Sequence, residues 1–341
     1  MMTRRIFTFF LVLLMFWFFT YGKKRAELPE IKKPVGMAVD DTQLYVTEIA
    51  TVFIYSLKDF KFIKKFGSQG QGPQEFQVLP HVPIGVDAST DKLIVTSIRK
   101  ISYFTKQGEF IKEEKALGQA YRLRRFGDKF LGWSFARDKG ISHSTVCIFD
   151  SKLNKLKEVY RVKDSYQGPG RGYRVLPKVF TYHSYDNKII VPGKDDNTID
   201  IFDSNLKKLF SIRIDQERRK VDQKFKDQLT HYYKTSPESK KKYESMLRPL
   251  IWPDYFPVIA DFFVDEATIY VLLWKEGKEG TGGNEFFTYD MTGKFKKRVN
   301  IPIRYESELR PYPTLVHKGK LYQLVEDENK LVWEFHMSHF Q

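Results

Sequence analysis

The sequence has 341 residues, and its hydrophobic fraction of 42% is enough for a packed core, which excludes a disordered chain. Aromatic residues make up 16%, mostly Phe and Tyr, and this bias favours strands over helices. The formal net charge is +15, but the basic residues are spread over many segments, as in solvated faces and protected strand edges. The charge alone therefore does not indicate nucleic-acid binding.

The first 22 residues are expected to lie outside the fold. A short basic head precedes an apolar run at residues 6–21, and Thr20-Tyr21-Gly22 fits a signal-peptide cleavage site. The alternative is an uncleaved membrane tether through residues 6–21, although the run is slightly short for a bilayer span. Both interpretations predict export to the periplasm or the cell surface, where a protein or an anionic envelope component is a more plausible partner than nucleic acid.

The single cysteine, Cys147, excludes an internal disulfide and a cysteine-based metal site. It lies in STVCIFD, an alternating pattern typical of a strand, so we expect a buried side chain rather than a nucleophile. Export without disulfides is typical of a bacterial cell envelope.

Similar segments recur along the chain. Each contains a strand-like run that follows a polar turn and precedes an alternating strand, and most then turn into a fourth strand. The runs are LYVTE (44–48), LIVTS (93–97), FLGWS (130–134), IIVPG (189–193), IYVLL (269–273) and LYQLV (321–325). This repetition predicts an all-β fold, a six-bladed β-propeller in which neighbouring sheets cover each other's faces. The alternative is a pair of β-sandwich domains, which the repeated order of turns disfavours.

The predicted ring spans residues 26–341. Its last blade lacks a fourth strand, so we expect residues 26–32 to pair there and close the ring, with Pro29 tolerated at a sheet edge. The blades are expected near residues 34–66, 84–113, 120–160, 177–213, 256–301 and 313–341.

Residues 33–76 contain a Pro-Val-Gly-Met-Ala-Val-Asp opening and end on FGSQGQGPQEF, and this segment resembles an NHL-type propeller repeat. Residues 252–271 resemble a segment of bacterial envelope propellers of the NHL-like or TolB-like class. The resemblance implies binding more than catalysis. Within the repeat, GSQGQGPQEF (67–76) lacks the Lys-Ser/Thr of a phosphate-binding loop, so we expect a turn between blades with Phe76 packed inside.

Long loops are predicted on one face of the ring, the long-loop face, where the connections between blades emerge; the turns on the opposite, short-turn face are tight. The largest, residues 215–250, is predicted to be a helical insertion between blades 4 and 5, with Asp215 as an N-cap and a second start at Ser236-Pro237-Glu238. Loops of this kind build binding faces on rigid scaffolds.

These loops are rich in Tyr, Trp and Arg, the residue types that dominate interface hot spots. Arginines in QGPGRGYR (167–174) are suited to bind a carboxylate or a phosphate, whereas packing between loops is the alternative role. The candidate binding residues are Tyr166, Arg171, Arg174, Trp252, Tyr255, Arg310 and Tyr312.

No catalytic residue, metal or cofactor is predicted. The histidines show no metal-binding spacing, and Asp40, Asp87 and Asp265 are expected to cap turns on the short-turn face. The sequence thus favours an exported, noncatalytic binding or scaffold propeller that docks a ligand or protein on its long-loop face. The alternative is a propeller hydrolase or lyase with a metal or an acid/base pair in the axial channel.

Overall fold

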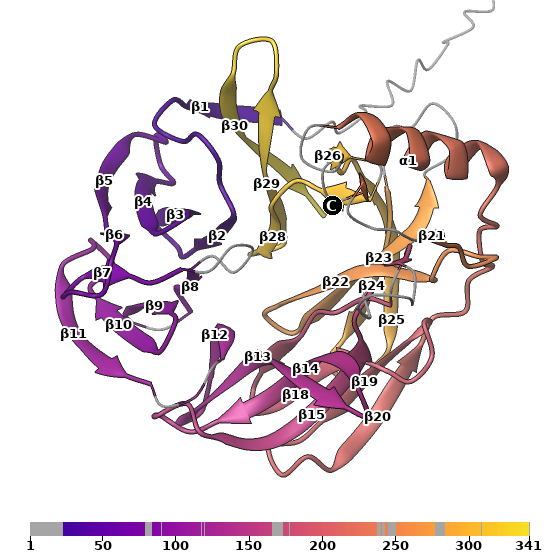
Figure 1. Cartoon of the computed structure of the whole chain (residues 1–341), viewed down its shortest axis with the longest axis horizontal. Helices are drawn as coiled ribbons and strands as arrows, with labels where there is room; N and C mark the ends of the chain where they lie inside the picture. The colour runs from indigo at the N-terminus through magenta and orange to yellow at the C-terminus, as the bar shows by residue number, and fades with distance from the viewer. Residues whose placement is uncertain are drawn as a thin grey trace, which may run out of the picture.

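The computed structural model describes residues 23–78, 84–89, 91–116, 118, 120–165, 173–176, 178–236, 240, 243–244, 250–276, 284–307 and 309–340. Within these ranges the strands form six four-stranded antiparallel sheets around a common axis (Figure 1). The predicted six-bladed β-propeller is therefore confirmed, and the two-sandwich alternative is excluded.

Each sheet runs from an innermost strand at the axis to an outermost strand at the circumference. The innermost strands are β2 (Gly36–Val39), β8 (Gly85–Asp87), β12 (Tyr121–Phe126), β17 (His183–Tyr185), β22 (Ile259–Asp265) and β28 (Thr314–His317). The second strands are β3 (Gln43–Glu48), β9 (Leu93–Ser97), β13 (Lys129–Asp138), β18 (Lys188–Pro192), β23 (Thr268–Glu276) and β29 (Lys320–Asp327). The third strands are β4 (Thr51–Ser56), β10 (Lys100–Phe104), β14 (Ile141–Phe149), β19 (Thr198–Phe202), β24 (Asn284–Asp290) and β30 (Val332–His339). The outermost strands are β5 (Phe62–Phe66), β11 (Phe110–Lys115), β15 (Lys155–Lys163), β20 (Lys208–Arg213), β25 (Phe295–Ile301) and β1 (Lys23–Leu28).

The core lies between neighbouring sheets. Second and third strands are covered on both faces, which explains why they are continuous apolar runs rather than strictly alternating ones. One cluster joins Tyr45 and Val52 of the first sheet in the chain to Leu93 and Phe104 of the next. Cys147 is fully buried within another such cluster, as its strand pattern predicted.

The ring is closed by β1, which pairs antiparallel with β30, so that Leu28 faces Trp333. The sequence analysis placed this strand at residues 26–32, whereas it occupies Lys23–Leu28. The strand ends before Pro29, because proline has no backbone N–H for the ladder. The chain then folds inward, where the Nε1–H of Trp333 donates to the Lys32 carbonyl at 2.9 Å.

The glycine-rich stretch is a turn between sheets, as predicted. Gly67 has a φ of +85°, and a Cβ there would meet the ring of Phe76, which is fully buried against Phe104. The carboxylate of Glu75 accepts from the Gly72 N–H at 2.8 Å, so a side chain of the loop itself occupies the place that a bound phosphate would take. Its ends pair as β6 (Ser68–Gln69) and β7 (Glu75–Phe76).

The described helix, α1 (Gln223–Thr235), lies between β20 and β22 in the chain and packs through Phe225 and Leu229. Its N-cap is Asp222, whose side chain accepts from the Phe225 N–H at 2.8 Å; the predicted cap at Asp215 is wrong. The segment before Asp222 is extended because its backbone bonds to residues 254–256. The predicted second start lies mostly outside the described residues.

Two further strand pairs lie near this insertion and after β25: β16 (Tyr173–Arg174) with β21 (Leu250–Ile251), and β26 (Tyr305–Ser307) with β27 (Arg310–Pro311). In the part of the chain that the structure describes, no helix is long and apolar enough to span a bilayer. The expected signal or tether at residues 1–22 lies outside that part.

Trp333 is the main apolar partner of the closing strand β1, so truncation of its side chain is expected to destabilise the fold. We expect Trp333→Ala to lower the free energy of unfolding by about 3 to 5 kcal/mol, because a side chain that is only 6% exposed leaves a cavity and loses its bond to Lys32. Urea unfolding measures the change. Leu331→Ala, two residues away and exposed, is the control and is expected to change stability by no more than about 0.5 kcal/mol. Equal effects of the two substitutions would contradict this view of closure.

Candidate functional site

The axial region opens into a basic recess on the long-loop face, where the innermost strands begin. The recess has a volume of about 390 Å³. Its charged lining comes from Arg122 and Arg124 of β12, Asp261 of β22, Asp87 of β8 and Arg310 of β27. Arginines outnumber carboxylates here, so the recess is suited to an anionic group.

Arg122 owes its position to an irregularity in β12. The register of this strand shifts between Tyr121 and Arg124, and Arg122 has a φ of +48°, a left-handed conformation that is unusual for arginine. The hydroxyl of Tyr182, from the neighbouring sheet, donates to the Arg122 carbonyl at 2.6 Å and holds this backbone. The Arg122 guanidinium also lies 5.9 Å from the centre of the Trp133 ring.

Asp261 also projects from a register shift, between Ile259 and Asp261 of β22. Burial raises the pKa of its carboxyl to about 6, even though the Phe262 N–H donates to it at 2.8 Å and Arg122 and Arg124 favour its charged form. The Asp261 carboxyl therefore titrates close to neutral pH.

His183 fixes the wall beside Asp261. Its Nε2 lies 3.1 Å from the Phe262 carbonyl, and burial lowers its pKa to about 3, with Arg124 adding to the effect. The imidazole is thus neutral and donates its Nε2–H to that carbonyl. This bond connects the innermost strands β17 and β22.

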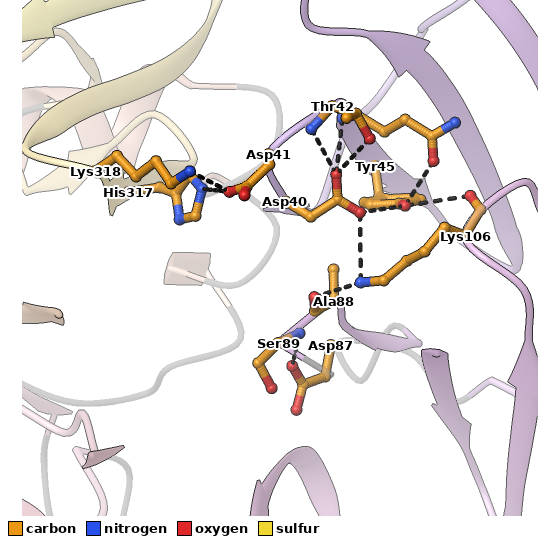
Figure 2. A network of polar contacts seen from close by, with 11 residues as sticks. Asp40, Asp41, Thr42, Tyr45, Asp87, Ala88, Ser89, Lys106, His317 and Lys318 are labelled. Carbon is orange, nitrogen blue, oxygen red and sulfur yellow. Dashed lines mark hydrogen bonds and ion pairs between the residues drawn. The ribbon is translucent and has the colours of Figure 1, made fainter. Parts of the chain in front are cut away.

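A second, acidic recess of about 600 Å³ opens on the short-turn face. Figure 2 shows the polar network along part of its wall, where side chains from three sheets meet. Lys318 Nζ lies 2.7 Å from an Asp41 oxygen, and Lys106 Nζ lies 3.4 Å from Asp40 and bonds to the Ala88 carbonyl. These contacts connect the sheet of β28 to that of β2, and the sheet of β2 to that of β8.

Of the three aspartates predicted as turn caps, Asp40 and Asp87 do cap turns. All three, including Asp265, also contact a neighbouring sheet. Asp40 accepts from the N–H groups of residues 42 and 43, and Asp87 from that of Ser89. Asp87 also accepts from the Arg125 N–H at 3.0 Å, and Asp265 from the Gly319 N–H at 2.9 Å, each across to the next sheet. The hydrogen bonds of Asp87 and Asp265, together with the ion pair between Asp40 and Lys106, thus join neighbouring sheets near the axis.

The predicted binding residues do not form one site. Arg310 and Tyr312 line the basic recess, where Arg310 pairs with Glu306 and the buried Tyr312 packs edge-on to Trp333. Arg174, Trp252 and Tyr255 lie at the α1 insertion. Trp252 packs against Phe225, as the alternative role predicted, whereas Arg174 and Tyr255 are exposed. Tyr166 and Arg171 lie outside the described residues.

Four residues at the recess were not predicted from the sequence: Arg122, Arg124, Asp261 and His183. The signal was available in YRLRRF (121–126), where arginines alternate with apolar residues on an innermost strand, and in IADFFVD (259–265), where one aspartate interrupts an apolar run. A charged residue at such a position points to the axis or to a neighbouring sheet. Among the described residues no group of three or more His, Cys, Asp or Glu is arranged to hold a metal ion.

Comparison with known proteins gives the fold. A family model described as "6-bladed beta-propeller" matches residues 29–167, and no curated protein matches the chain. A solved structure from Bacteroides fragilis, described as a proposed exported protein, is 12% identical, with 94% of each chain covered and a TM-score of 0.53. A member of the duf4221 family from Bacteroides vulgatus is 10% identical over 94% of this chain and 96% of that chain, with a TM-score of 0.48. A protein of unknown function from Bacteroides caccae is 11% identical over 79% of this chain and 81% of that chain, with a TM-score of 0.42.

Replacing Asp261 by Asn tests the burial of its carboxylate. Because the pKa is raised from an ordinary 3.8 to about 6, ionisation of Asp261 destabilises the folded chain as the pH rises between these values. The Asn variant does not ionise. We expect it to gain stability relative to the parent as the pH rises from about 4 to about 6, and to keep the gain above that range. Urea unfolding over a pH series measures the difference, and a gain independent of pH would contradict the assignment.

Proposed function

We propose that this chain is an exported, noncatalytic binding propeller of the NHL-like class, and that it docks an acidic segment of a protein partner on its long-loop face. The basic recess is the observation that supports the proposal most directly. Arg122, Arg124 and Arg310 converge there on a volume of about 390 Å³, enough for a few side chains of a partner. A partner carboxylate would replace water around these guanidinium groups and accept paired hydrogen bonds.

The surroundings of the recess favour a protein over a small anion. Large apolar side chains are exposed towards the same face, in the turns between second and third strands, in the second half of β13 and in the α1 insertion: Ile49, Leu331, Phe135, Ile251 and Tyr255. Exposed apolar patches mark surfaces that bind other proteins, and aromatic residues and arginines are enriched there. The rigid ring below them supports such loops without moving itself.

Export is supported by the apolar run at residues 6–21 behind a basic head, which is the pattern of a secretory signal. A protein with the same fold is described as a proposed exported protein, in agreement with this localisation. In an envelope compartment the partner is an exposed protein segment rich in Asp or Glu.

A tetraglutamate peptide is a direct probe of the proposal. We expect the parent chain to bind it, to bind tetraglutamine much more weakly, and to lose about tenfold or more in affinity when Arg122 or Arg310 becomes Ala, because each substitution removes a charged hydrogen bond. Calorimetric titration measures the affinities. Arg298→Ala, which removes an exposed arginine of β25 at the circumference, is the matched control.

We also expect the affinity for tetraglutamate to depend on pH. Below about pH 6, Asp261 is protonated and no longer competes for Arg122 and Arg124, so peptide affinity rises as the pH falls through this value. Equal binding of the two peptides, or an equal loss in Arg298→Ala, would refute the proposal.

The second candidate is a propeller hydrolase or lyase, and Asp261 is the observation in its favour. A carboxyl with a pKa near 6, beside two arginines in an axial recess, is suited to general acid/base catalysis. Ester, lactone and uronate substrates test it. Turnover by the parent that is abolished in Asp261→Asn, with tetraglutamate binding retained, would favour the enzyme over the binding module.

A further inference from the structure

The outermost strands show a pattern that docking on the long-loop face does not explain. The described residues include twelve exposed large apolar side chains, and seven of them are the first or second residue of an outermost strand. These seven are Phe62 and Ile63 of β5, Phe110 and Ile111 of β11, Leu156 of β15, Leu209 of β20 and Phe295 of β25. The repetition across five sheets distinguishes them from apolar residues scattered singly.

All seven lie on one side of the ring. An outermost strand follows the turn from the third strand and pairs antiparallel with it, so it begins at the short-turn face and ends at the long-loop face. Towards the far ends of the same strands the apolar side chains are covered fully or in part: Ile212 and Ile301 are 3% and 1% exposed, and Phe66 and Val162 are half-buried. The exposure is therefore specific to the rim of the short-turn face, which we call the rim belt: residues 62–63, 110–111, 156, 209 and 295.

The outermost strands, five of which begin with the rim belt, are rich in basic residues. Lysines and arginines outnumber acidic residues in β1, β5, β15, β20 and β25, and the two are equal in β11. Acidic residues of the short-turn face lie in the central recess, where Asp41 pairs with Lys318, and in the rim turns, where Asp150, Asp203 and Asp290 accept from backbone N–H groups of their own turns. A rim with apolar and basic side chains matches the surface of an anionic bilayer.

The direction of the chain indicates the same partner. The sixth outermost strand is β1, whose first residue, Lys23, faces Met337 near the end of β30 and so lies at the same rim. In the sequence, the apolar run 6–21 ends two residues before Lys23. A chain that enters the ring from a bilayer would therefore enter it at the rim belt.

We propose that the rim belt binds an anionic phospholipid bilayer, so that the short-turn face lies on the membrane and the basic recess faces away from it. Lysines contact the headgroups, and the apolar side chains enter the boundary between headgroups and acyl chains. The rim belt and the apolar run at residues 6–21 would each bind the membrane weakly, and together they set one orientation of the ring. The docking face remains open to partners above the membrane.

The test uses the full chain in vesicles that contain lipids with spin-labelled acyl chains. A fluorophore is attached at Leu156→Cys in the rim belt or, as the matched control, at Leu331→Cys on the long-loop face, which is 79% exposed. Cys147 is fully buried and needs no replacement. In vesicles of phosphatidylcholine with phosphatidylglycerol, we expect quenching at position 156 and none at position 331.

Charge is tested by two triple variants with the same change in net charge. Replacement of three rim lysines by Gln should lower the equilibrium constant for binding of the short-turn face to the membrane by about a hundredfold. The quenching at position 156 should then be lost. Replacement of lysines on the long-loop face should have no effect. The rim variant changes Lys157, Lys207 and Lys294, and the control variant changes Lys194, Lys220 and Lys224, all of them exposed.

Three results would overturn the proposal. The first is equal quenching at the two positions, or quenching at neither. The second is quenching at position 156 that is unchanged in vesicles of phosphatidylcholine alone, since the belt would then have no electrostatic role. The third is tight binding of a soluble sulfated polysaccharide by the rim lysines without lipid contact, which would assign the belt to a different class of polyanion.

Discussion

Ring closure is the constraint on which the rest of the structure depends. A four-stranded sheet has two faces to cover, and a row of six can cover all of them only if the first and the last become neighbours. The pairing of β1 with β30 makes them neighbours, because it completes the sixth sheet with a strand from the other end of the chain. Hydrogen bonds between sheets then surround the axis: Asp87 reaches Arg125, Ser184 reaches the Arg125 carbonyl, and Asp265 reaches Gly319.

Closure also explains why polar residues are present on the innermost strands. Around the axis each described innermost strand belongs to its own sheet, side chains connect neighbouring strands, and two recesses lie between them. Register shifts in β12 and β22 place Arg122 and Asp261 in one of them. The bond from Tyr182 and the neutral His183 hold these irregular backbones in place, so the charges of the recess are preorganised.

The fold was predictable from the sequence because closure imposes a local pattern. Second and third strands are buried on both faces, and runs such as LYVTE and IYVLL are therefore apolar throughout and recur after a turn. The helix was predicted for the same kind of reason, since Phe225 and Leu229 recur at helical spacing. Its start was misplaced by seven residues, because backbone bonds between residues far apart in sequence extend the segment after Asp215.

The site was only partly predictable. Composition drew attention to aromatic residues and arginines in loops, and two of them, Arg310 and Tyr312, do line the recess. The same criterion selected Trp252, which packs against the helix. The sequence alone does not distinguish an aromatic residue of an interface from one that packs inside the fold. Arg122 and Asp261 were missed because their importance comes from which strands are innermost, and from bulges that depend on the neighbouring sheet.

The most direct test of the account is a crystal structure of the chain with tetraglutamate bound. We expect a peptide carboxylate in the recess on the long-loop face, within hydrogen-bond distance of the Arg122 or Arg310 guanidinium, with the six sheets unchanged. A peptide bound elsewhere, or a recess filled by the chain's own side chains with Asp261 paired to both arginines of β12, would contradict it.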